Sequence, residues 1–394
     1  MTALGIVMVF SAGAAFGAKR YGDWTYFLRR ESLFAVTGLT AFVFGLRTDY
    51  SAFRRWSYPL LLVTIALLGA VLIFGTRVNG ALRWFRFGPL SFQPSEVAKF
   101  ALVLYLAVLL SRNAERMRAF SMGFLPPLLM TGVVIGLVVV EDLGTALILG
   151  MVTLVLMFVS GARMSYLVFA VLVTAPVVWK VLITGKAWRM KRMLAFLEPW
   201  QHCQNAGYQL CESLISVGSG GIWGQGLGAS RQKLFFLPEA HTDFILAIIG
   251  EELGLLGVLA LLLAFALLFW RGIVAALRAR DAFGSYLAFG ITSLFALQAL
   301  GNMGVVLGLL PTKGLALPFI SYGGTSLVVS LFMAGVLGNI SARAPEPRRT
   351  PVFPARPRRR GPGKNRLVPQ GPQIMVDVTG KRRAPPPEGE PEPA

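Results

Sequence analysis

The stretch LPEAHTDFILAIIGEE, residues 237–252, decides how the rest of the chain is interpreted. It ends a long polar segment and continues into an apolar run, so we expect His241 and Asp243 at the rim of a membrane helix. Charged side chains at such a place are costly and are usually retained for a function. Asp243 is therefore the first candidate for a functional residue.

Composition indicates an integral membrane protein. Hydrophobic residues make up 55% of the 394 residues, and many apolar runs are long enough to span a bilayer. The net charge is +19, from 38 Lys and Arg against 19 Asp and Glu, and 12 of the cations follow Ser341. In a chain with so many apolar spans, cations suit lipid headgroups or phosphorylated lipid substrates. Nucleic acid is therefore not an expected partner.

Ten apolar runs predict an all-α membrane domain of ten helices over residues 1–341, with a long extracytoplasmic loop, residues 184–242, between helices seven and eight. Loops on one side carry ten Lys or Arg against eight in the short loops on the other side, which favours cytoplasmic termini. The first run ends in small residues, as a signal peptide does, but lacks a preceding cation, so we expect a membrane helix. The runs are residues 1–17, 32–46, 57–75, 95–111, 124–140, 145–160, 165–183, 243–270, 284–310 and 325–340.

The C-terminal segment, residues 342–394, has a different composition. It holds 13 Pro and 12 Lys or Arg among its 53 residues and almost no aromatic side chains. Such a segment buries too little apolar surface to fold, so a disordered basic tail is expected. It is either a solvated extension or a segment that binds anionic lipid headgroups or an acidic partner through its charge.

The only cysteines, Cys203 and Cys211, lie in the expected extracytoplasmic loop, where a disulfide persists. On one continuous helix they would lie roughly 12 Å apart, too far for a disulfide. Gly207 can break such a helix and allow the bond. Both arrangements remain open at this point.

Two charged residues begin the fourth helix. Glu96 and Lys99 are three residues apart and therefore share a helix face, where they can form an ion pair. They either satisfy each other structurally or line a cavity in which Lys99 meets an anionic substrate.

If residues 243–270 form one helix, Asp243 lies within about 40° of Gly250 and Gly254 on the helical wheel. The small residues let another helix approach, so this face is expected to point into the protein. Glu251 is turned roughly 80° from Asp243 and Glu252 about 180°. Glu251 is therefore the expected neighbour of Asp243, and Glu252 needs another partner.

The long loop supplies cations. Residues 188–200, WRMKRMLAFLEPW, place Lys191 and Arg192 among aromatic and apolar residues, as in an interfacial segment. Residues 218–233, GSGGIWGQGLGASRQK, are rich in glycine and include Arg231 and Lys233. This backbone can turn its amides towards an anion, although flexibility alone also explains it. Arg83, in the loop before the fourth helix, is a further cation on this side.

The remaining motifs restrict the chemistry. No Ser or Cys stands in an elbow motif beside His241, and two histidines do not make a His-based zinc site. Asp243 is then a general base, or a ligand to a divalent cation such as Mg²⁺ or Mn²⁺; no other cofactor is expected. A carboxylate near cations suits transfer from a lipid-linked phosphate, where the base takes a proton from an acceptor hydroxyl and cations stabilise the departing pyrophosphate.

Four segments resemble the SEDS family (shape, elongation, division and sporulation), whose members polymerise lipid II into glycan strands. These are RWFRFGPLSFQPSEVAK (83–99), EDLGTALI (141–148), GYQLCESLISVGSGGIWGQGLGASRQKLFFLPEAHTDF (207–244) and NMGVVLGLLPTKGLALPFISYGGTS (302–326). The resemblance covers nearly all of residues 4–341. PEAHTDF and LPTKGLALPFISYGG are more similar to the division branch than to the elongation branch.

The resemblance implies ten helices in the bacterial inner membrane at the division septum, with cytoplasmic termini. Asp243 matches the catalytic aspartate, Glu96 and Lys99 a charged pair beside a central cavity, and Asp142 the acidic position of a DLGT motif. It also implies a class B penicillin-binding protein and other division proteins as partners. A polymerase of the elongation branch, a lipid II flippase and a scaffold are the alternatives. The expected substrate-binding residues are Lys99, Glu96, Arg83, Lys191, Arg192, Arg231, Lys233, Asp142 and Glu251.

Overall fold

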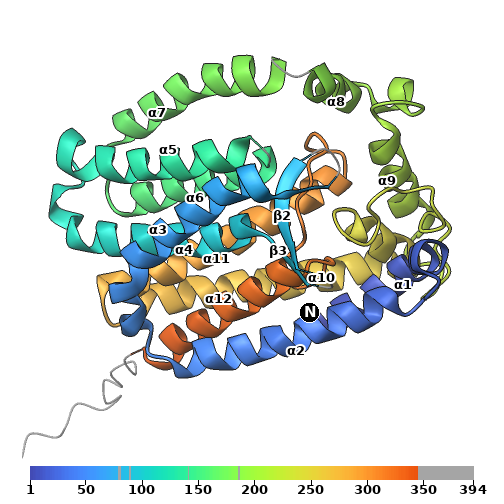
Figure 1. Ribbon diagram of the computed structural model, residues 1–394, viewed down its shortest axis with the longest axis horizontal. Helices are drawn as coiled ribbons and strands as arrows, with labels where there is room; N and C mark the ends of the chain where they lie inside the picture. Colours follow the sequence, from blue (N-terminus) through green and yellow to red (C-terminus); the bar gives the residue numbers. More distant parts are fainter. Residues whose placement is uncertain (79–80, 88–89, 141, 185–186, 345–394) are drawn as a thin grey trace, which may run out of the picture. The chain divides into compact units, whose positions relative to one another are not determined.

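Helices dominate the structure, a computed structural model that describes residues 1–78, 81–87, 90–140, 142–184 and 187–344 (Figure 1). The expected tail lies outside the described residues from residue 345 onward. The α-helices are α1 (Thr2–Tyr21), α2 (Tyr26–Arg47), α3 (Tyr50–Phe74), α4 (Pro94–Arg112), α5 (Leu125–Val139), α6 (Leu143–Val159), α7 (Met164–Val177), α8 (Ala187–Leu197), α9 (Tyr208–Ser219), α10 (Ile245–Leu277), α11 (Ala282–Val306) and α12 (Gly324–Ala342).

The described chain contains a helix at each of the ten expected ranges, and seven of these helices are long and apolar enough to cross a membrane. The seven are α1, α3, α4, the helical segment Phe120–Val139, α10, α11 and α12. The helices α6 and α7 are apolar but shorter. The protein is thus an all-α membrane protein by its main elements, and the number of spans stays a prediction.

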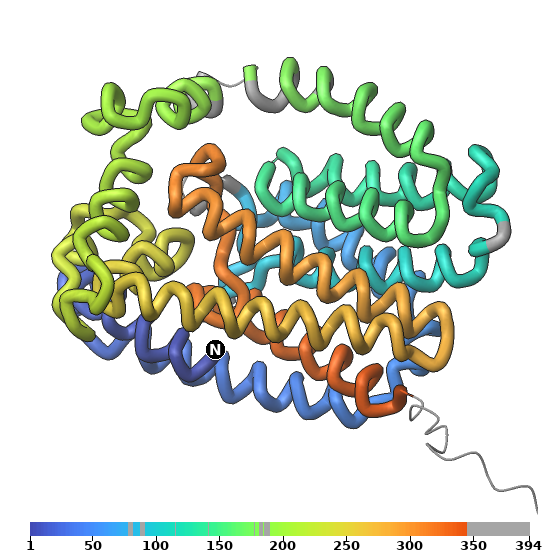
Figure 2. Tube along the Cα trace, turned by 180° about the vertical axis from the view of Figure 1, so that it is seen from behind, coloured from blue at the N-terminus to red at the C-terminus, as the bar shows by residue number. Residues whose placement is uncertain are grey.

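Two packing features organise the helices. In α4, 83% of the most apolar window is buried, against 17% in α10, so α4 lies at the centre and α10 presents apolar side chains to its surroundings. The helices α2 and α12 lie side by side in both views (Figures 1 and 2). A Cβ atom at Gly335 of α12 would lie 2.2 Å from the Phe42 carbonyl oxygen of α2. Glycine is therefore needed for this close approach.

A small antiparallel sheet lies between α3 and α4 in the sequence, where a plain loop was expected. Its strands β1 (Thr76–Val78), β2 (Ala81–Phe87) and β3 (Leu90–Phe92) pair in the order β1-β2-β3. β1 and β3 have three residues each, too few for an alternating pattern to reveal them, and the seven residues of β2, ALRWFRF, do not alternate strictly between apolar and polar. The sheet matters for the site because β2 carries Arg83.

The long loop is largely helical. The expected interfacial segment forms α8, which is followed by the short 3₁₀ helix η4 (Pro199–His202) and by α9. Cys203 and Cys211 form a disulfide with a Cα–Cα distance of 5.6 Å. Cys203 directly follows η4, which ends at His202, and Cys211 lies in α9, which begins at Tyr208 after Gly207, so no continuous helix joins them. The structure therefore decides between the two open arrangements in favour of the bond.

The prediction of one continuous helix over residues 243–270 is wrong at two places. The helix α10 begins at Ile245, so Asp243 lies in the preceding loop. Gly254 has φ 66° and ψ −165°, and the two helical parts of α10 meet there at a kink. This conformation is open essentially only to glycine. The angles calculated from Asp243 along one continuous helix therefore do not hold.

The glycine-rich segment forms hydrogen bonds with the backbone groups of α10 that the kink leaves without a partner in the helix. The amides of Gln225 and Gly226 donate to the Glu251 and Glu252 carbonyls over 2.9 and 3.0 Å. In return, the amides of Leu255 and Leu256 donate to the carbonyls of residues 221 and 222 over 2.9 and 3.3 Å. Polar backbone that a kink frees within a membrane must find such partners. The amides of Gln225 and Gly226 are thus used to bind α10, and anion binding by the rest of the segment stays a prediction.

Candidate functional site

Asp243 is held between the loop before α10 and the segment that follows α11. The side-chain amide of Asn302 donates to the Asp243 carbonyl over 2.7 Å and to the Leu315 carbonyl over 2.5 Å. A Cβ atom at Gly314 would lie 2.9 Å from Oδ2 of Asp243, so the backbone there lies against the carboxylate. Asn302 therefore fixes the main chain on both sides of the carboxylate.

Replacing Asn302 with Ala is expected to lower both stability and activity. The change leaves two carbonyl oxygens without this donor, and each unsatisfied buried group costs about 1–3 kcal/mol. Thermal unfolding in detergent measures the effect on stability, and turnover by the purified protein measures the effect on activity. Ser330→Ala, at another buried polar residue of a membrane helix, is the control. An unchanged unfolding temperature in Asn302→Ala would contradict the expectation.

The environment of Asp243 favours its neutral form. Burial, followed by the negative charges of Glu239 and Asp142, raises its pKa to about 7. The positive charges of Arg83 and Arg192 act in the opposite direction. The carboxyl group can therefore gain and lose a proton near neutral pH, which is the property that a general base requires.

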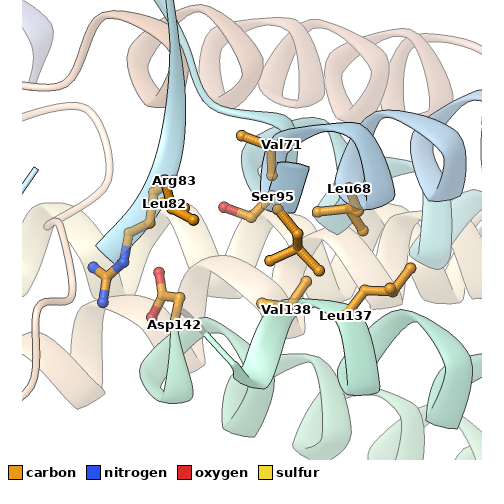
Figure 3. Close-up of a pocket in the computed structure, with 9 residues that line it drawn as sticks. Leu68, Val71, Leu82, Arg83, Ser95, Leu137, Val138 and Asp142 are labelled. Atoms are coloured by element: carbon orange, nitrogen blue, oxygen red, sulfur yellow. The ribbon is translucent and has the colours of Figure 1, made fainter. Parts of the chain in front are cut away.

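Asp142 approaches the site from the start of α6. Its carboxylate caps that helix by accepting from the Thr145 amide over 3.1 Å and from the Thr145 hydroxyl over 3.0 Å. It lines a pocket together with Arg83 and Ser95, with an empty volume of about 270 Å³ that includes open solvent. Figure 3 shows the Arg83 guanidinium pointing towards the Asp142 carboxylate. The DLGT motif thus has a clear structural role and also places a charge near Asp243.

Arg192 reaches the site from α8. Burial lowers its pKa, the charge of Asp243 raises it and the charge of Arg83 lowers it. These interactions bring three sequence-predicted residues together from α8, β2 and the loop before α10. The neighbouring Lys191 is exposed on α8. The site therefore combines carboxylates with two guanidinium groups on elements far apart in sequence.

The predicted ion pair on α4 is confirmed. The Lys99 ammonium lies 2.7 Å from the Glu96 carboxylate, and the side chains are only 2% and 7% exposed. Both are inside the protein, and the preceding Ser95 lines the pocket that Arg83 and Asp142 also line. The pair therefore lies at the start of α4, directly after a residue that lines the pocket.

The remaining candidates engage other parts of the protein. Glu251, the expected neighbour of Asp243, accepts hydrogen bonds from Ser230 and from the Arg231 amide, over 2.6 and 2.9 Å. Lys233 forms an ion pair with Glu252 over 2.8 Å. The Arg231 side chain is exposed. The glycine-rich segment thus uses these groups to bind α10.

His241 belongs to an aromatic cluster. Its ring centroid lies 4.6 Å from that of Phe27, 5.6 Å from that of Phe16 and 5.7 Å from that of Tyr322. The Tyr322 amide donates to the His241 carbonyl over 3.0 Å. Burial lowers the pKa of the imidazole. These contacts make His241 part of the packing that holds the loop.

Sequence reasoning did not select Asn302, Glu239 or Gly314. Asn302 is a polar residue within an apolar helix, and this signal was available because such residues are rare without a role. Glu239 lies in the same short motif as Asp243. Its effect on the Asp243 pKa, like the close approach of Gly314, depends on how distant segments fold.

Asp243 is the candidate ligand for a divalent cation. Among the described residues, no group of three or more His, Cys, Asp or Glu is placed to hold a metal ion. Mg²⁺ is often bound by one or two carboxylates together with substrate phosphates. Asp243 fits the first part of that description, and a pyrophosphate substrate would have to supply the second.

Comparison with known proteins identifies the family. A family profile of cell cycle proteins, named for FtsW, RodA and SpoVE, matches residues 1–346. The probable peptidoglycan glycosyltransferase FtsW of Geobacter metallireducens is 46% identical over 346 residues, which are 87% of this chain and 92% of the relative. Stage V sporulation protein E of Bacillus subtilis is 42% identical and covers 86% of this chain and 93% of its own.

Solved structures of similar proteins indicate the same family. A chain of a peptidoglycan synthase complex that coordinates polymerization and crosslinking has a TM-score of 0.70 at 29% identity, covering 87% of this chain and 98% of that one. The rod shape determining protein RodA of Thermus thermophilus has a TM-score of 0.64 at 28% identity, covering 88% and 94%. The chain belongs to the FtsW, RodA and SpoVE family of cell cycle proteins, the SEDS family.

Proposed function

We propose that this protein is a peptidoglycan glycosyltransferase that polymerises lipid II during septal wall synthesis, with Asp243 as its catalytic base. The observation that carries the proposal is a partly buried carboxyl group with a pKa of about 7, next to Arg83 and Arg192. Relatives named as probable peptidoglycan glycosyltransferases at up to 46% identity support the reaction class.

In the proposed step, Asp243 accepts the proton of an acceptor sugar hydroxyl. The hydroxyl oxygen bonds to the anomeric carbon of the donor, and the bond from that carbon to the lipid pyrophosphate breaks with its electron pair. Arg83 and Arg192 stabilise the negative charge that develops on the pyrophosphate. A divalent cation held by Asp243 and the pyrophosphate would supply the same stabilisation, so cation dependence is part of the test.

The other substrate contacts that we propose are based on the position and exposure of each side chain. Asp142 would orient Arg83, and Lys191 and Arg231, which are exposed, would meet the headgroup from solvent. The Glu96–Lys99 pair would border the route to the pocket. We propose these substrate contacts together with the catalytic role of Asp243.

The protein is integral to the bacterial inner membrane. We propose ten spans, cytoplasmic termini, an extracytoplasmic loop over residues 184–242 and a place at the septum. We also propose a class B penicillin-binding protein as partner, together with other division proteins, supported by the likeness to a synthase complex that joins polymerization to crosslinking. The basic tail would contact anionic lipid headgroups.

The pH dependence of the reaction should report the charge on Asp243. Only the ionised base accepts a proton, so kcat/KM is expected to rise through about pH 7 and then level off. Arg83→Gln removes a charge that lowers the Asp243 pKa, so the midpoint should move to higher pH. Glu239→Gln removes a charge that raises it and should move the midpoint to lower pH.

Initial rates measured from pH 5.5 to 9 check this expectation. Arg29→Gln, at an exposed cation that pairs with Asp23 over 3.3 Å, is the control and should leave the midpoint in place. Midpoints that move in the same direction in the two site variants would contradict the assignment of the titrating group.

The proposed function is tested with the full chain, purified with a partner transpeptidase and given lipid II. Glycan polymer on gels is the expected product, and a parallel reaction with a chelator tests cation dependence. Failure to form polymer while labelled lipid II crosses reconstituted vesicles would favour the flippase alternative. Complementation of division-defective and elongation-defective cells separates the septal role from the elongation role.

A further inference from the structure

The segment of residues 230–252 is closed at its two ends, and Asp243 lies near its middle. We propose that Glu251 and Glu252 are positioning residues that join the two ends of this segment and so fix the loop between them. The Lys233–Glu252 ion pair is the central contact of this closure. The proposal rests on the proposed function of Asp243. It assigns Glu251 and Lys233 to holding the loop, in place of the substrate contacts expected from the sequence.

Glu251 binds the start of the segment. Its carboxylate accepts hydrogen bonds from the Ser230 hydroxyl over 2.6 Å and from the Arg231 amide over 2.9 Å. A third bond, from the Ser216 hydroxyl over 3.0 Å, adds α9 to the same point. Glu251 is only 1% exposed, so these three donors replace its hydration.

Glu252 binds the same end of the segment from the other side. Its carboxylate lies 2.8 Å from the Lys233 ammonium, with the two side chains 0% and 9% exposed. The Ser11 hydroxyl of α1 donates to both carboxylate oxygens, over 2.7 and 2.9 Å. Removing one member of a buried ion pair leaves the other charged and unpaired. Lys233 also donates to the Ser11 hydroxyl over 3.0 Å. Removing either charge therefore breaks the pair that holds Lys233 on α10, while Glu251 still binds Ser230 and Arg231.

The backbone of the loop depends on this attachment. Phe235 and Glu239 have φ angles of 72° and 58°, a backbone region that residues other than glycine rarely adopt. Such conformations persist only where the surrounding structure imposes them. Glu239 also acts on the Asp243 carboxyl through its charge. A released loop would relax at these residues and change both the position and the surroundings of Asp243.

The kink in α10 lies directly after Glu251 and Glu252. Glu251 and Glu252 precede Gly254, and their carbonyls accept from the glycine-rich segment. Side chains and main chain of the same two residues thus hold residues 225–233. The helical part that starts at Ile245, directly after the Asp243 loop, is thereby joined to the segment in which the loop begins.

The test compares Lys233→Met and Glu252→Gln with the wild type in the full chain with its partner. Hydrogen–deuterium exchange of residues 233–244 is expected to become about 10-fold faster, because the loop opens locally. The kcat for lipid II polymerisation, per folded molecule, should fall by about 100-fold, since a small misplacement of a catalytic group has that effect. KM should stay within about twofold, and the pH midpoint should move because Asp243 changes its distance from Glu239, Asp142, Arg83 and Arg192.

The controls separate fastening from other roles. Lys233→Arg keeps the charge and should restore most of kcat, and Arg29→Gln breaks an exposed ion pair and should change nothing. Ser230→Ala removes a hydroxyl that binds Glu251 and accepts from the Lys233 amide, keeps both charges, and serves if the charge variants do not fold. Faster exchange and a several-fold lower kcat are expected. Unchanged exchange in these variants overturns the proposal, as does a raised KM with unchanged kcat, which would make Lys233 a substrate ligand.

The exchange measurement does not depend on catalysis. If Asp243→Asn polymerises lipid II as well as the wild type, the proposed function fails, while faster exchange in Lys233→Met still supports a fastened loop. If exchange is unchanged and Asp243→Asn is inactive, the fastening fails and the proposed function stands.

Discussion

Asp243→Asn is expected to reduce the kcat of lipid II polymerisation by about 1,000-fold, the range typical of a lost general base. The amide is nearly the same size as the carboxylate and cannot accept the acceptor's proton. The backbone bond from Asn302 to the residue 243 carbonyl is unaffected, so the loop should keep its position. Polymer formed by the purified full chain with its partner measures the effect, and binding of labelled lipid II should stay within about twofold.

Two variants sharpen this test. Asp243→Glu restores a carboxylate at a displaced position and should recover part of the activity. Asp23→Asn removes a half-buried carboxylate that pairs with Arg29, away from Asp243, and should leave kcat unchanged. If Asp243→Asn keeps more than a tenth of the wild-type kcat, Asp243 is not the base. Inactivity of all three variants would indicate that handling of the protein, and not the carboxylate, limits the assay.

Gly254→Ala is expected to give the largest loss of stability. Its φ of 66° and ψ of −165° are strained for any other residue, at a cost of about 1–3 kcal/mol. The added Cβ would also lie 2.3 Å from the Gly224 amide nitrogen and 2.6 Å from the Ile222 carbonyl oxygen. Backbone atoms cannot move aside easily, and the four hydrogen bonds between α10 and residues 221–226 would be disturbed. We expect a total loss above about 3 kcal/mol.

Thermal unfolding in detergent, followed by size-exclusion recovery, measures this loss. Gly136→Ala in α5 is the matched control, because a Cβ atom there would have no neighbour within 4 Å. Its unfolding temperature should equal that of the wild type or exceed it slightly, since alanine favours a helix over glycine. An equal unfolding temperature for Gly254→Ala would show that the kink relaxes without cost, contrary to its contacts.

Helices were predicted well because their signal is local. A long apolar run has few alternatives to a helix in a bilayer, and a charged pair at spacing three lies on one face. The Glu96–Lys99 ion pair was therefore available from sequence. The three short strands were missed, since their pairing depends on residues that are neighbours only after folding.

The kink in α10 shows where helical periodicity fails. The sequence IIGEELGLLG satisfies a continuous apolar helix, and glycine alone does not mark a break. The break is stable because the glycine-rich segment supplies four hydrogen bonds to it, and nothing within α10 encodes that segment. The kink follows Glu251, so the predicted angle between Asp243 and Glu251 fails for a separate reason: α10 begins at Ile245, and Asp243 lies before the helix.

The membrane class, the places of the helices, the Glu96–Lys99 pair and the choice of Asp243 as candidate follow from composition, spacing and charge in an apolar chain. The groups that surround Asp243 and the partners of Glu251 and Glu252 emerge only from the packed helices. Arg83, Asp142 and Arg192 come from β2, α6 and α8. The physical reason is that desolvation and charge interactions depend on distances in space, and residues far apart in the chain acquire those distances only when the helices pack.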